Sequence, residues 1–77
     1  MKKVIVYSTN TCPWCTKVKD YLDKNNVDYE AFDVASDREK ATEMVNKSGQ
    51  QGVPVIDIDG QIVVGFNQKK LDEYLEL

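Results

Sequence analysis

The sequence predicts an α/β fold in which one four-stranded mixed sheet packs with three helices, in the order β-α-β-α-β-β-α. Four short runs rich in β-branched and aromatic residues are typical of strands, at residues 2–8, 27–34, 53–58 and 61–65. Amphipathic stretches follow the first, second and fourth runs and predict helices. The 77 residues are enough for a single domain, 1–77, near the lower limit for a fold held by a hydrophobic core alone.

The first predicted strand, residues 2–8, leads through a short turn into the first helix. Pro13 suits the first helical position, because the N–H that it lacks would have no partner within the helix. Asn25-Asn26 ends the helix. Its buried face is expected to consist of Trp14, Cys15, Val18, Tyr21 and Leu22.

Residues 27–34 largely alternate between apolar and polar side chains, which predicts a second strand. Because a helix connects it to the first strand, the two strands should be parallel. Ser36 and Glu39 fit a capping box, with Ser36 as the N-cap of a second helix that ends at Gly49. This helix has a thin apolar face, so we expect it to pack at the edge of the sheet.

The C-terminal third predicts a hairpin followed by a final helix. Asp59-Gly60 is typical of a type I′ turn, which would join strands 53–58 and 61–65 in antiparallel fashion. Asn67 can cap the last helix. The buried side of that helix is expected to consist of Leu71, Tyr74, Leu75 and Leu77.

The composition excludes several classes of function. A net charge of −3 gives no basic footprint for nucleic acid, and the lysines form no patch for a membrane surface. No apolar run reaches the roughly 18 residues that span a bilayer. We expect a soluble, cytoplasmic protein and a monomer. With two cysteines and no histidine, one chain cannot complete a zinc site, so no metal is expected.

Cys12 and Cys15 form a pair at the first strand-to-helix junction, which is typical of a redox pair. If Pro13 is the first helical residue, Cys12 is the N-cap, where free N–H groups and the helix dipole favour a thiolate. Cys12 is then the expected nucleophile, and Cys15, one turn further on, resolves the mixed disulfide. Two alternatives are a pair of small apolar residues and half of a metal site shared across a dimer.

Three segments together resemble the glutaredoxin family: Cys12-Pro13-Trp14-Cys15, Gly52-Val53-Pro54-Val55 and Val64-Gly65-Phe66-Asn67. The resemblance covers essentially the whole chain and implies the minimal thioredoxin fold. It implies that Pro54 follows a cis peptide bond, although most X–Pro bonds are trans. It also implies that the backbone of Val53 pairs with an extended thiol peptide. As an alternative, Val53 is simply an apolar strand residue.

The resemblance implies a second binding element at the start of the last helix. There, backbone N–H groups of Gly65, Phe66, Asn67 and Gln68 would hold a carboxylate of glutathione. Phe66 is expected either to form an apolar lip beside the thiolate or to belong to the core. Lys69 and Lys70, in the same turn, either serve the anion or are simply solvated.

Two further residues complete the candidate substrate-binding set. Trp14 lies between the cysteines, and Thr9 stands where many glutaredoxins carry a lysine.

The expected function is that of a small dithiol thiol–disulfide oxidoreductase, which reduces protein disulfides or glutathione mixed disulfides. It needs no bound cofactor, and glutathione is the expected co-substrate. One alternative is a glutaredoxin-like electron donor to ribonucleotide reductase or a similar enzyme, reduced by thioredoxin reductase. Another is a module that binds an iron–sulfur cluster between two subunits, although Cys15 argues against it.

Overall fold

The computed structural model describes residues 3–76. The predicted order of elements and the α/β fold class are confirmed. Residue 2, expected to begin the first strand, and Leu77 lie outside the described residues. The elements are β1 (Val4–Ser8), α1 (Pro13–Lys24), β2 (Glu30–Asp33), α2 (Arg38–Ser48), β3 (Val55–Ile58), β4 (Gln61–Val64) and α3 (Gln68–Leu75).

The four strands form one mixed sheet in the order β2-β1-β3-β4. Strand β1 runs parallel to β2 and antiparallel to β3, and β3 and β4 form the expected hairpin. Asp59 and Gly60 have φ angles of 53° and 94°. Two positive φ angles in a two-residue loop are the signature of a type I′ turn, so this prediction is confirmed.

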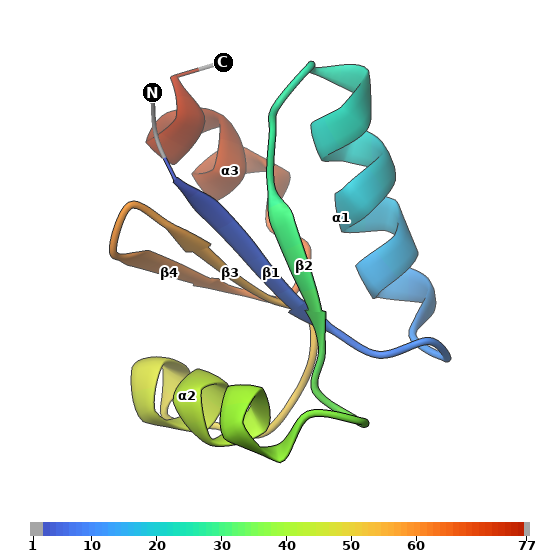
Figure 1. Ribbon diagram of the computed structural model, residues 1–77. Coiled ribbons are helices and arrows are strands. Elements are labelled where there is room, and N and C mark those ends of the chain that lie inside the picture. The colour runs from blue at the N-terminus through green and yellow to red at the C-terminus, as the bar shows by residue number, and fades with distance from the viewer. Residues whose placement is uncertain (1–2, 77) are drawn as a thin grey trace.

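Each face of the sheet has its own core (Figure 1). Helices α1 and α3 cover one face, and α2 lies alone on the other. Under α1 and α3 the fully buried side chains include Val6, Leu22, Ile56 and Leu71. The expected burial of α3 is confirmed for Leu71, and Tyr74 and Leu75 pack against the same cluster.

The expectation that the second helix packs at the sheet edge is wrong. Met44 of α2 is buried together with Tyr7 and Val55, so the helix lies over the sheet face. A thin apolar stripe is sufficient because apolar side chains of the sheet surround Met44, and the hydrogen bonds of Glu43 and Lys47 with the sheet add to the packing. The sequence shows the apolar residues of α2 as a periodic pattern, but it does not show the polar contacts between α2 and the sheet.

The N-cap of α2 is also one residue later than expected. Asp37, not Ser36, accepts the N–H of Lys40, at 3.1 Å. The Asp33 carbonyl accepts the N–H groups of both Ser36 and Asp37, and it also accepts the Ser36 hydroxyl. This turn engages Ser36 and leaves the Asp37 carboxylate to cap the helix. Gly49, with φ of 75°, ends the helix as expected.

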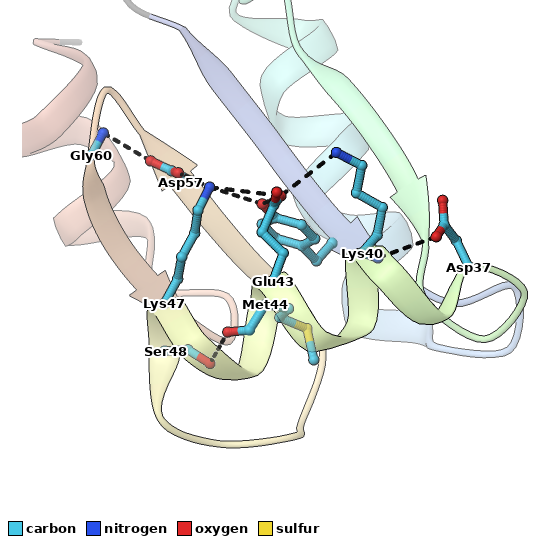
Figure 2. Close-up of polar contacts among 9 residues, drawn as sticks. Asp37, Lys40, Glu43, Met44, Lys47, Ser48, Asp57 and Gly60 are labelled. Atoms are coloured by element: carbon cyan, nitrogen blue, oxygen red, sulfur yellow. Dashed lines mark hydrogen bonds and ion pairs between the residues drawn. The ribbon is translucent and has the colours of Figure 1, made fainter.

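A polar cluster fastens α2 to the sheet (Figure 2). Tyr7, Glu43, Lys47 and Asp57 make up what we call the Tyr7 cluster. The Tyr7 hydroxyl donates to the Glu43 carboxylate and accepts from Lys47 Nζ at 2.9 Å. Lys47 Nζ also lies 2.6 Å from Asp57 Oδ2 on β3. Two residues of the helix are thereby joined to two central strands.

The Tyr7 cluster predicts a loss of stability in acid. The hydrogen bond from Tyr7 is the main reason that the pKa of Glu43 is lowered from its ordinary 4.5. A carboxyl group whose pKa is lower in the folded than in the unfolded state stabilises the protein at pH values above the unfolded-state pKa. This contribution disappears as the pH falls through the folded-state pKa. Urea unfolding of the wild type and of Glu43→Gln should therefore differ at about pH 7, and the difference should shrink as the pH falls below 4.5 and through the lowered folded-state pKa of Glu43. A difference that is independent of pH would contradict this account.

Candidate active site

Cys12 occupies the N-cap of α1, as predicted. Its backbone is extended, with φ of −97° and ψ of 110°, and Pro13 is the first helical residue. Cys12 Sγ accepts the Cys15 N–H at 3.3 Å. The side chain is half-buried, so the sulfur is held by the first helical turn while one side stays open to a substrate.

Cys15 lies one turn further along α1, and its side chain is only 1% exposed. Burial is the main reason that its thiol pKa is raised to about 11, and a hydrogen bond with the Cys12 side chain adds to the effect. A backbone hydrogen bond at Thr9 and the charge of Lys19 oppose it. The two sulfurs are therefore unequal: one is accessible at a helix terminus, and the other is a protonated thiol in the core.

The peptide bond between Val53 and Pro54 is cis, as the resemblance implied. It brings the Val53 carbonyl within 3.8 Å of Cys12 Sγ, close enough for a weak hydrogen bond from the thiol. Strand β3 begins only at Val55, so Val53 precedes the sheet instead of belonging to it. Within residues 3–76 the Val53 N–H donates to no acceptor. Its backbone is therefore open to pairing beside the reactive sulfur.

The turn before α3 is tied to the cis-proline segment. The Gly65 N–H donates to the Pro54 carbonyl at 2.8 Å, and Gly65 adopts φ of 76°, which favours glycine. The expectation that this N–H is free to bind an anion is therefore wrong, because it is already used. Asn67 caps α3 as predicted, accepting the Lys70 N–H at 3.1 Å.

Trp14, two residues after Cys12, belongs to an aromatic group with Phe66 and Tyr21. Trp14 is 55% exposed, so the expectation that it belongs to the buried face of the first helix is wrong. Its ring lies 6.4 Å from that of Phe66, which in turn lies 5.7 Å from the ring of Tyr21. Lys17 Nζ sits 4.4 Å from the Trp14 ring centroid, a cation–π distance. The Phe66 ring thus lies beside Trp14 and also packs against the core under α1 and α3, which supports the core alternative, while the lip beside the thiolate stays a prediction.

A cleft of about 480 Å³ lies between the loop after β1 and helix α2. Thr9 and Val53 line it on one side. The opposite wall is formed by α2 and the segment before it, including Arg38 and Ala41, which the sequence did not single out. The sequence did not predict this wall, because we expected the helix to begin one residue earlier and to pack at the edge of the sheet. With α2 across the sheet face, residues of this helix line the same cleft as Thr9 of the loop after β1.

The candidate residues therefore fall into two groups around Cys12. In the first group, Val53 accepts a weak hydrogen bond from Cys12, and the Gly65 N–H donates to the Pro54 carbonyl. Thr9 belongs to the same group because it lines the cleft together with Val53. Trp14, Phe66 and Asn67 form a second group at the start of α1 and α3, where the rings of Trp14 and Phe66 lie 6.4 Å apart. Among residues 3–76, no three cysteine, aspartate or glutamate side chains come together as a metal site would require. No helix in that range is long and apolar enough to cross a bilayer.

The buried thiol predicts a pH-dependent second step. Attack by Cys15 requires its thiolate, so below the raised pKa the rate of Cys12–Cys15 ring closure should rise about tenfold per pH unit. Rapid-quench analysis of a preformed mixed disulfide on Cys12, between about pH 6 and pH 9, measures this rate. Lys19→Gln should slow closure at a given pH, because it removes a charge that lowers the Cys15 pKa. Lys24→Gln, at the far end of α1, should have no effect, and a flat pH profile would refute the prediction.

The comparisons with known proteins agree with this geometry. The family model Glutaredoxin matches residues 4–63. An uncharacterised glutaredoxin-like 8.6 kDa protein in the rubredoxin operon of Clostridium pasteurianum is 51% identical, over 92% of this chain and 95% of its own. Glutaredoxin 3 of Escherichia coli K12 is 34% identical, over 84% of this chain and 78% of its own length. The crystal structure of a glutaredoxin from Archaeoglobus fulgidus superposes with a TM-score of 0.90 at 27% identity, covering all of this chain and 89% of that one.

The sheet, the N-capping cysteine and the cis-proline define a thiol–disulfide oxidoreductase with a thioredoxin fold. With the family model matching most of the sequence, the chain belongs to the glutaredoxin family.

Proposed function

We propose that the protein reduces protein disulfides and glutathione mixed disulfides by a dithiol route, with glutathione as the reductant. The asymmetry of the two sulfurs carries the proposal: Cys12 is open at a helix N-terminus, and Cys15 is buried directly behind it. We place the activity in the cytoplasm, where thiols stay reduced. The protein acts as a monomer and needs no bound cofactor.

The reaction consists of two exchanges. The Cys12 thiolate attacks one sulfur of the substrate disulfide, forms a mixed disulfide and releases the other sulfur as a thiolate. Cys15 then loses its proton to water or to the departing thiolate, and it attacks Cys12 Sγ. The second substrate thiolate leaves, and a Cys12–Cys15 disulfide remains. Two electrons have passed to the substrate, and two glutathione molecules restore both thiols as they become glutathione disulfide.

Two features support the binding of a thiol peptide beside Cys12. The open N–H and the carbonyl of Val53 offer one rung of strand pairing to an extended backbone. Within residues 3–76, the N–H groups of Phe66 and Gln68 donate to no acceptor, so the turn before α3 retains donors for a carboxylate. Lys69 and Lys70 are exposed in the same turn and would add positive charge.

A second candidate differs in the reductant and in the enzyme that receives the electrons. A flavoenzyme of the thioredoxin-reductase type would reduce the disulfide, and the protein would pass electrons to ribonucleotide reductase or a similar enzyme. The exposed Trp14 beside Phe66 favours this candidate, because an apolar surface next to the reactive sulfur suits a protein partner. The neutral Thr9 in the cleft wall also offers no charge to glutathione.

The decisive test is to trap a Cys15→Ser variant with oxidised glutathione and weigh the product. An adduct of one glutathione on Cys12, released by reduced glutathione, is the expected result. If the oxidised wild type is instead reduced only by thioredoxin reductase and NADPH, the second candidate is correct. Purification without oxygen checks the cluster-binding alternative: a colourless monomer is expected, and a coloured dimer would contradict the proposal.

A further inference from the structure

The cleft beside α2 adjoins the reactive sulfur through Val53, although Cys12 itself is not among the residues that line it. Val53 belongs to both: its carbonyl lies 3.8 Å from Cys12 Sγ, and its side chain lines the cleft. Thr9, three residues before Cys12, lines the same space. At about 480 Å³ the cleft falls within the range of about 300–1,000 Å³ typical of ligand sites. A substrate attached to Cys12 and paired with Val53 would therefore extend into it.

Most of the cleft wall is apolar. Val34, Ala41, Val45 and Val53 contribute aliphatic side chains, and several of them are only half-buried. Small residues such as Ala41 leave room for a side chain from outside. Burying an aliphatic side chain there would remove apolar surface of both partners from water, which favours binding.

One cation lies in this apolar wall. Arg38, in the first turn of α2, is the charged residue among those that line the cleft. Within residues 3–76 it forms no ion pair. The other two cations of α2 are engaged, since Lys40 pairs with Glu43 and Lys47 pairs with Glu43 and Asp57. Arg38 is thus left to form a charged hydrogen bond with a carboxylate from outside.

From these observations we infer that the cleft is a specificity site for protein substrates that carry an aliphatic residue and an acidic residue close to the disulfide cysteine. The aliphatic side chain fills the space beside Ala41 and Val45, and the carboxylate binds Arg38. Glutathione can offer Arg38 a carboxylate but has no aliphatic side chain for the cleft. The protein therefore reacts faster with such a peptide disulfide than with a glutathione mixed disulfide. This inference rests on the proposed exchange at Cys12.

The test uses short capped peptides in which leucine and glutamate follow, or precede, a single cysteine. Each peptide, and glutathione, is joined as a mixed disulfide to thionitrobenzoate, whose release is coloured. Matched peptides replace leucine by serine, glutamate by glutamine, or both residues together. In one of the two orders, the leucine–glutamate peptide should react about tenfold faster than the serine–glutamine peptide and than the glutathione compound.

Two variants and one control locate the effect. Arg38→Gln should slow the glutamate peptide by roughly three- to tenfold and leave the glutamine peptide unchanged. Ala41→Gln, which places a polar side chain in the cleft, should remove the preference for leucine. Lys24→Gln makes the same change of charge on α1, on the other face of the sheet, and should behave as wild type. Arg38 is exposed and forms no ion pair within residues 3–76, so its replacement should not impair folding.

The outcomes separate this inference from the proposed function. If wild type reacts equally with all peptides, or if Arg38→Gln and Lys24→Gln behave alike, the cleft is not a specificity site. The proposed function still stands in that case, provided that the glutathione compound reacts at Cys12. If no mixed disulfide reacts, including that of glutathione, the proposed function itself fails.

Discussion

Replacing Cys12 by serine is expected to reduce disulfide exchange to the background rate, a loss of several orders of magnitude. The structure leaves no substitute nucleophile, because Cys15 is 1% exposed and its thiol pKa is raised to about 11. A serine hydroxyl at position 12 would remain protonated at neutral pH. The measurement is kcat/KM for reduction of a mixed disulfide in wild type and variant.

Cys15→Ser is the matched comparison for this prediction. It should retain the first exchange and accumulate the mixed disulfide on Cys12, because only the second exchange uses Cys15. Alkylation of the reduced wild type, followed by mass analysis, should label Cys12 first. Equal labelling of the two cysteines, or residual exchange in Cys12→Ser, would contradict the assigned roles.

Replacing Asp57 by alanine is expected to lower the free energy of unfolding by about 2–4 kcal/mol. The Asp57 carboxylate lies 2.6 Å from Lys47 Nζ, and it also accepts the Gly60 N–H at 2.8 Å. Its side chain is 11% exposed, so water replaces these partners poorly. Loss of the carboxylate would leave Lys47 partly buried without its nearest anion. Urea unfolding followed by far-UV circular dichroism measures the change.

Two further variants identify the cause. Asp28→Ala removes an exposed carboxylate in the loop before β2 and should change stability by less than about 0.5 kcal/mol. In a double-mutant cycle, Lys47→Met should cost much less in the Asp57→Ala background than in the wild type. Fully additive effects would show that the ion pair does not fasten α2 to the sheet.

The order of elements was predictable because each strand and helix carries its own local pattern. The Asp59-Gly60 turn, the Gly49 stop and the Asn67 cap are local backbone requirements, and all three are confirmed. The cis bond before Pro54 was different, since base rates alone favour trans. Only the resemblance to a family pointed to it.

The position of α2 could not be predicted, because it depends on contacts distant in the sequence. The hydrogen bond from Tyr7 to Glu43 joins residues 36 positions apart, and neither residue suggests the pairing by itself. The cleft depends on that position, so Arg38 was not recognisable as part of a site. Likewise, the Gly65 N–H looks free in the sequence, but the folded chain gives it the Pro54 carbonyl.

Trp14 gives the protein a built-in optical probe. It is the chain's single tryptophan, and it lies between the two cysteines with much of its ring exposed to solvent. A disulfide that forms next to an indole quenches its emission by electron transfer, whereas two thiols quench it less. The intrinsic fluorescence of the unlabelled protein should therefore rise as the Cys12–Cys15 bond is reduced. Redox titrations and stopped-flow measurements could then follow the native chain without an added dye.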